Sequence, residues 1–388
     1  MNHMKLPSDE ESTPWLLLLM AAAILVLVLI NSASASADTL TLPTAIPIDG
    51  GPLGTLKVQG MLSGLASTQS DTTSSDQSQR FDVDNAQMIL QKDSGEVQFL
   101  IQGGAYNFPV VGEPFTDTPD VVNNLYGPVP VAYIKFIPTD SVSLEVGKLP
   151  SLLGAESAWP WGNFNIERGL LWNLENTVTH GVQFNYSKGA ISASLAWTDG
   201  FYSHRFNNLT GSFSYTLGPT DTLTAVVYDT LGNTPYGSSA TPEVLNNSRI
   251  YNLIYIHTVG NWSFTPYFQY VESPASTELG YTHDNSASGV ALLADYAINK
   301  QWSLGARVEY VSSSGADNSS TNNNLLGYGP GSRAWTLTFT PTWQSGGLFA
   351  RAELSYARVV DYTSGLAFGS AGDRANQMRL LFETGVVF

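Results

Sequence analysis

Apolar and polar residues alternate with a period of two along most of the chain after residue 55. The stretches that begin at Val142, Phe213, Trp302 and Trp335 are clear examples. Successive side chains of a strand point to opposite faces, so this pattern predicts β-strands with one apolar and one polar face. Almost no helical period occurs in this part of the sequence. An all-β protein follows from this pattern.

The connections between the predicted strands alternate between short and long. Seven short turns lie at 92–95, 138–141, 187–190, 218–221, 259–262, 299–301 and 344–347. Eight long loops lie near 66–80, 105–129, 148–177, 199–208, 231–247, 273–285, 312–331 and 359–374. These connections separate 16 strands. Such alternation is typical of a transmembrane antiparallel β-barrel with short periplasmic turns and long extracellular loops. The alternative, a β-sandwich with an aromatic core, gives no reason for it.

Composition fits a strand face that meets lipid. Charged residues are 13% of the chain, and aromatic residues, which a barrel places near the two membrane interfaces, are 11%. Lys and Arg number 17 against 33 Asp and Glu, a formal net charge of −16, which disfavours nucleic-acid binding. The absence of cysteine excludes disulfide bonds and thiolate metal sites.

The first residues resemble an export signal. Sixteen apolar residues, 15–30, precede the small residues Ala35-Ser36-Ala37, which predicts a signal peptide over 1–37 cleaved near Ala37 and Asp38. An uncleaved membrane anchor is the alternative. Cleavage removes one basic and three acidic residues, so the net charge changes from −16 to −14. We expect residues 38–54 to form a short periplasmic segment and 55–388 to form a barrel in the outer membrane of a Gram-negative-type bacterium.

The final predicted strand ends on an aromatic residue. Phe388, Val386 and Phe382 share one of its faces. This resembles the assembly signal of bacterial outer-membrane barrels, and the resemblance implies the barrel assembly machinery as a partner.

The third long loop, 148–177, is the longest and is rich in apolar residues. An exposed loop of this kind would be unfavourable, so we expect it to fold into the lumen. The segments Gly147-Lys148, Leu153-Gly154-Ala155-Glu156, Arg168-Gly169-Leu170-Leu171-Trp172 and Thr179-His180-Gly181-Val182 resemble the OmpL-like β-barrel porin family. The resemblance implies a bacterial outer-membrane channel, and it supplies no catalytic residues to carry over. General porins are often trimers, which suggests a homotrimer.

Charged residues of this loop and of the strands form the candidate site. The predicted constriction comprises Lys148, Glu156, Trp159, Trp161, Glu167, Arg168, Trp172 and Glu175. The predicted lumen wall comprises Lys57, Glu145, Arg307, Glu309, Arg351, Glu353, Arg379 and Glu383. We expect the wall cations to form a basic ladder that faces the acidic loop and sets up a transverse field. Alternatively, Arg307 and Arg351 pair with Glu309 and Glu353, two residues further along each strand.

These features predict a passive aqueous channel for small polar solutes and ions, with a weak preference for cations. We expect no enzyme activity, no cofactor and no metal site. No evident carboxylate partners accompany the histidines His180, His204, His257 and His283. Glu156 with Glu167 gives only a weak pattern for a catalytic carboxylate pair. The stretch 71–76 gives only a weak pattern for a calcium site. No segment is long enough to form a separate plug domain. A non-conducting barrel acting in adhesion or structure and a soluble sugar-binding β protein remain alternatives.

Overall fold

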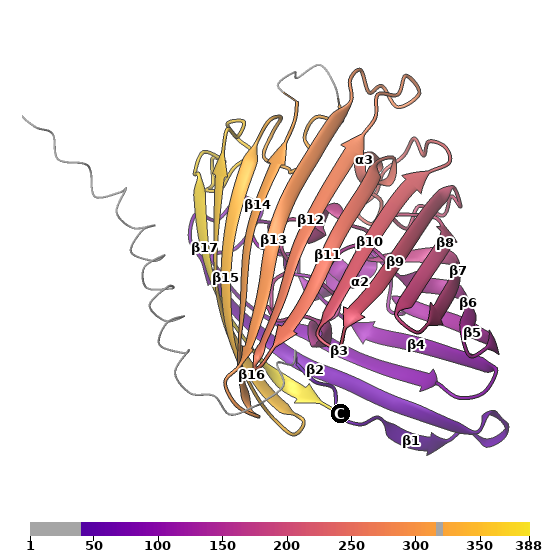
Figure 1. Ribbon diagram of the computed structural model, residues 1–388. Coiled ribbons are helices and arrows are strands. Elements are labelled where there is room, and N and C mark those ends of the chain that lie inside the picture. The colour runs from indigo at the N-terminus through magenta and orange to yellow at the C-terminus, as the bar shows by residue number, and fades with distance from the viewer. Residues whose placement is uncertain (1–39, 316–320) are drawn as a thin grey trace, which may run out of the picture.

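The computed structural model describes residues 40–315 and 321–388. Sixteen antiparallel strands, β2 to β17, each pair with their neighbours in the chain, and β17 pairs with β2 to close the barrel (Figure 1). The predicted all-β barrel and its strand number are confirmed. The predicted signal peptide lies outside the described residues.

The structure gives the following element bounds. The strands are β1 Ile46–Asp49, β2 Thr55–Gln69, β3 Gln79–Lys92, β4 Val97–Ala105, β5 Val131–Thr139, β6 Val142–Pro150, β7 Val178–Lys188, β8 Ile191–Thr198, β9 Asn208–Gly218, β10 Asp221–Thr230, β11 Arg249–Val259, β12 Trp262–Ser273, β13 Asn285–Ala297, β14 Trp302–Ser313, β15 Arg333–Ser345, β16 Leu348–Val360 and β17 Asn376–Val387. The helices are η1 Gly51–Leu53, α2 Thr118–Asn124, η2 Pro160–Gly162, η3 Trp172–Leu174 and α3 Glu243–Asn246.

The seven short turns and eight long loops occur where the sequence predicts them, and they lie at opposite ends of the barrel. At the turn end, β1 pairs with the first residues of β2, where β17 no longer covers that edge. Leu40, just before it, is buried with Met61, Phe349 and Val387. Within the described ranges, no helix is long and apolar enough to cross a membrane.

The outward face of the strands is apolar. Leu195, Phe213, Leu292, Val308 and Leu380 are between 40 and 56% exposed, although each lies inside a strand. A soluble protein rarely exposes so large an apolar surface, whereas a barrel in a bilayer requires it. Trp335 and Tyr310 pack together towards the loop end, and Trp302 lies at the turn end, as interfacial aromatic residues do.

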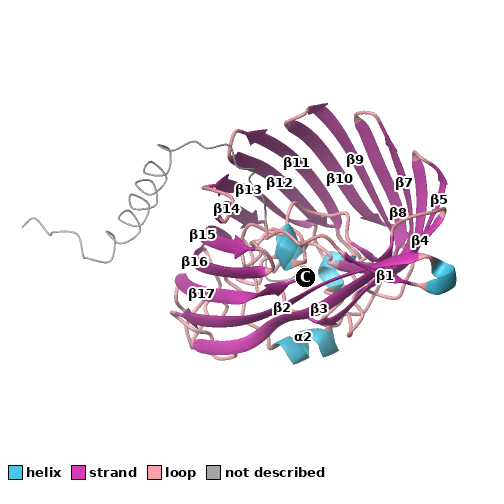
Figure 2. Cartoon of the chain, turned by 90° about the horizontal axis from the view of Figure 1, so that it is seen from below, coloured by secondary structure: helices cyan, strands magenta, loops and turns pink. Residues whose placement is uncertain are grey.

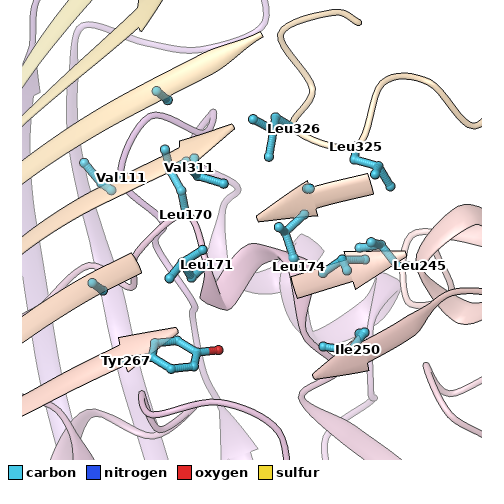
Figure 3. Close-up of a cluster of buried hydrophobic side chains, with 14 of the residues drawn as sticks. Val111, Leu170, Leu171, Leu174, Leu245, Ile250, Tyr267, Val311, Leu325 and Leu326 are labelled. Atoms are coloured by element: carbon cyan, nitrogen blue, oxygen red, sulfur yellow. The ribbon is translucent and has the colours of Figure 1, made fainter. Parts of the chain in front are cut away.

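The interior holds the third loop together with parts of other loops. Figure 2, seen from below, shows loop segments within the ring of strands. This arrangement confirms the predicted inward fold of 148–177. Leu170, Leu171 and Leu174 of this loop pack with Ile250 and Val311 on the lumen side of β11 and β14 (Figure 3).

Gly104, near the end of β4, allows a close approach to β3. Its φ is +133°, and a Cβ atom there would lie 2.0 Å from the carbonyl oxygen of Ala86. We predict that Gly104→Ala lowers the free energy of unfolding by about 1–3 kcal/mol because the backbone becomes strained. Urea unfolding in detergent measures this loss. Gly211→Ala is the control, since open space surrounds that glycine; an equal loss there would contradict the explanation.

Candidate functional site in the barrel lumen

Two carboxylates of the wall hold the backbone of the third loop. Glu353 on β16 accepts hydrogen bonds from the N–H groups of Ile166 and Glu167. Glu309 on β14 accepts them from Leu170, at 3.1 Å, and Leu171, at 3.3 Å. Both carboxylates are 1% exposed. Hydrogen bonds are stronger in a buried site than in water, so these four contacts fix the loop against β14–β16.

Three buried ion pairs lie in the lumen, on the wall formed by β14–β17 and between that wall and the third loop. Arg307 Nη1 lies 2.6 Å from Glu156 Oε1, which joins β14 to the loop. Arg379 Nη1 lies 2.5 Å from Glu167 Oε1, which joins β17 to the loop. Arg351 Nη2 lies 2.5 Å from Glu383 Oε2, within the wall. All of these side chains are at most 4% exposed.

Burial dominates the titration of the loop carboxyl groups. It raises the pKa of Glu156, although the Arg307 guanidinium opposes this shift. It also raises the pKa of Glu175 well above its usual range, although the Tyr267 hydroxyl donates a hydrogen bond to it. Burial lowers the pKa of Arg168 to about 10, against the attraction of Asp84. These three side chains are therefore buried between the third loop and its surroundings, away from water.

The prediction that the cations of the wall form a basic ladder is wrong. Lys57 lies at the turn end and pairs with Asp93 at 2.5 Å, with both side chains at least 40% exposed. Arg307, Arg351 and Arg379 each contact a carboxylate directly. A buried cation requires an anionic partner, so these three arginines do not form a row of unpaired positive charges.

The expected transverse field is absent between these same groups, because Glu156 and Glu167 touch Arg307 and Arg379 instead of facing them across water. The alternative of local pairing holds in part. Arg307 Nε lies 3.4 Å from Glu309, but Arg351 pairs with Glu383 and not with Glu353.

The remaining predicted residues pack the loop. Trp159 is 8% exposed, stacks on Trp161 and meets Tyr106 edge to face. Trp172 lies 5.8 Å from Phe108, between ring centroids. Lys148 donates to the carbonyl oxygens of Tyr126 and Val129 of the second loop. Glu145 pairs with Lys135 at 3.0 Å on the lumen side of β5 and β6.

The second loop also enters the lumen, which sequence reasoning missed. Arg168 N–H donates to Pro109, and Val111 N–H donates to Arg168. Arg379 donates to the carbonyl oxygens of Val110 and Glu113. Burial raises the pKa of Glu113 to about 7. The apolar run Phe108-Pro109-Val110-Val111 was the signal in the sequence that could have revealed this docking.

A polar strip covers the opposite wall towards the turns. Its residues alternate with the apolar outward residues of β7–β10 and include Asn185, Ser194, Ser212, Ser214 and Thr224, all part-exposed. Ser194 donates to Asn185 at 2.7 Å, and the Ser214 and Thr224 hydroxyls lie 2.8 Å apart. Water-accessible hydroxyl and amide groups thus line this side of the lumen.

A hydrophobic core fills the loop end of the lumen along β10–β16. Besides third-loop leucines it contains residues of five further loops: Val111, Phe201, Leu245, Leu325 and Phe368. The loops therefore fill part of the lumen, although the sequence has no segment long enough for a separate plug domain.

Two weaker sequence patterns have structural explanations. Asp76, from the stretch 71–76, accepts from Phe115 N–H and pairs with Arg80 at 3.2 Å. Glu156 and Glu167 are each engaged by an arginine, as described above. The expectation that the histidines lack carboxylate partners is wrong for two of them: His180 lies 2.7 Å from Asp199, and His257 lies 2.7 Å from Asp221.

A closed 16-stranded barrel with an apolar outward face and an inward third loop defines the class of outer-membrane barrels of the porin type. The family model described as "Putative beta-barrel porin-2, OmpL-like" matches residues 55–388. The chain belongs to this family. Fold and family support a location in the outer membrane, among its lipids.

Solved structures share the fold at low sequence identity. A loop L8 deletion mutant of OmpT, an outer membrane protein of Vibrio cholerae, has a TM-score of 0.57 and 11% identity; the match covers 86% of this chain and 99% of that one. The outer membrane channel DcaP of Acinetobacter baumannii has a TM-score of 0.55 and 12% identity; the match covers 85% and 96%. No curated protein matches the chain significantly in sequence.

Proposed function

We propose that the protein is a passive diffusion channel for small polar solutes and ions, with a weak preference for cations. The polar strip on β7–β10 carries this proposal, because its hydroxyl and amide groups are part-exposed inside a barrel whose other wall is dry. Such groups replace water around a polar solute without binding it tightly. The net charge of −14 that remains after the expected cleavage favours cations near the channel.

Substitutions on the two faces of β8, together with one on the lumen face of β9, test the path. We expect Ser194→Tyr combined with Ser212→Tyr, both on the polar strip, to lower single-channel conductance in planar bilayers by at least about twofold, because the rings enter the path. Ala193→Tyr is the matched control on the outward face and should leave conductance unchanged. Reversal potentials in a salt gradient test selectivity; clear anion preference would contradict that part of the proposal.

A non-conducting barrel that acts through its external loops is the second candidate function. The hydrophobic core that joins six loops at the loop end favours it. Wild-type protein that inserts into bilayers yet passes neither ions nor a size series of neutral sugars would support this second function over the channel.

Assembly and processing are separate proposals. Export by cleavage near Asp38, insertion guided by Phe388, Val386 and Phe382, assembly as a homotrimer and the absence of catalysis remain predictions. The mature N-terminus and the mass of the native oligomer can be measured directly by mass spectrometry.

A further inference from the structure

Two histidines and an aspartate converge outside the lumen, at the loop end of β7. His180, Asp199 and His204 each offer one ligand atom, and these atoms lie within 4.8 Å of one another. The rings of His180 and His204 are 4.9 Å apart between centroids. His180 shares a face of β7 with the outward-facing Phe184, whereas His204 is exposed on the loop that follows β8. The cluster is therefore open to water beside the barrel.

Asp199 holds the cluster in place. Its Oδ1 accepts from Thr179 Oγ1, at 2.9 Å, and from His180 N–H, at 2.7 Å. Its Oδ2 lies 2.7 Å from His180 Nδ1 and accepts from His204 N–H at 3.0 Å. The carboxylate is fully buried and is engaged in four contacts. It therefore orients the imidazole of His180 and holds the backbone of His204, and it leaves the Nε2 atom of His180 for another partner.

The tautomer of His180 follows from this contact. The Nδ1 atom of His180 is the ring nitrogen that faces the carboxylate, 2.7 Å from Asp199 Oδ2. A carboxylate oxygen in this position accepts a hydrogen bond from Nδ1, so Nε2 is the ring nitrogen left to bind a metal. A carboxylate behind a histidine in this way is the usual support of a metal-binding imidazole.

The loop turns His204 towards His180. Both Tyr202 and His204 have a positive φ, of 57° and 56°, which non-glycine residues adopt at a cost. The Tyr202 ring lies 4.3 Å from that of His180 and 5.1 Å from that of His204. Nearby Lys148 is occupied by two carbonyl oxygens.

We propose that His180 and His204 bind one divalent transition-metal ion of the zinc, copper or nickel class, with Asp199 as the positioning residue and water at the open positions. Two nitrogens on one tetrahedral zinc ion lie roughly 3.4 Å apart. The two ring centroids lie 4.9 Å apart and His204 is exposed, so its ring can rotate towards a metal ion bound by His180. The two-histidine set suits these metals, whereas calcium and magnesium prefer oxygen ligands.

The test uses the full chain without a histidine tag, stripped of metal and folded in detergent. Calorimetric titration with Zn²⁺ should give one site per chain. His204→Ala, at an exposed position, should abolish it, and Asp199→Asn should weaken it by about 10- to 100-fold. His257→Asn is the matched control, because His257 also pairs with an aspartate at 2.7 Å but lies outside the cluster.

Electron paramagnetic resonance of the Cu²⁺ form should show two coordinated nitrogens in the wild type, and His204→Ala should lose this signal. Heat-modifiable gel mobility confirms that each variant is folded. Absence of stoichiometric Zn²⁺ binding, or binding that survives in His204→Ala, would overturn the proposal.

Discussion

Replacing Arg307 by methionine should lower the free energy of unfolding by about 3–5 kcal/mol. The guanidinium is fully buried between Glu156 and Glu309 and also donates to the carbonyl oxygen of Glu167. Methionine has a similar volume, so the loss comes mainly from two carboxylates that remain buried without their cation. Urea unfolding of the protein in lipid vesicles, followed by tryptophan fluorescence, measures it.

Two further variants make this result specific. Arg333→Met removes an ion pair with Asp361 in which both side chains are about half exposed, and it should leave the unfolding midpoint nearly unchanged. Adding Glu156→Gln and Glu309→Gln to Arg307→Met should recover part of the stability, since the stranded charge is removed. No recovery would mean that the loss came from packing and not from charge.

Leu195→Arg should destabilise the protein in a bilayer by about 2–4 kcal/mol. Leu195 lies in the middle of β8, is 56% exposed and points outwards. A charge at that depth must leave water for hydrocarbon, which the apolar outward face otherwise avoids. Unfolding in vesicles, compared with wild type at equal lipid concentration, gives the difference.

The neighbouring residue supplies the control. Ser194 points into the part-exposed polar strip, so Ser194→Arg should cost much less than Leu195→Arg. Equal losses at the two positions would contradict the assignment of the outward face to lipid.

The sequence alone determined the barrel. Strand alternation and the alternation of short and long connections are local properties, and both turns and loops occur where those patterns place them. The inward fold of 148–177 was also predictable, because its tryptophans and leucines required burial. The same reasoning applies to Phe108–Val111 in the second loop. Its apolar run is shorter than that of the third loop and therefore gives a weaker signal.

Only the tertiary structure decided which charges meet. Arg307 and Glu156 are 151 residues apart, and Arg379 and Glu167 are 212 residues apart, so no periodicity could pair them. The barrel brings β14–β17 against the third loop, and burial then forces each arginine onto a carboxylate. His180 and His204 meet for a similar reason, because a loop with positive φ turns back on the adjacent strand. The local sequence therefore determines which face of each strand is apolar and where turns and loops lie. The partners of the charged side chains depend on how the barrel closes and how the loops pack inside it.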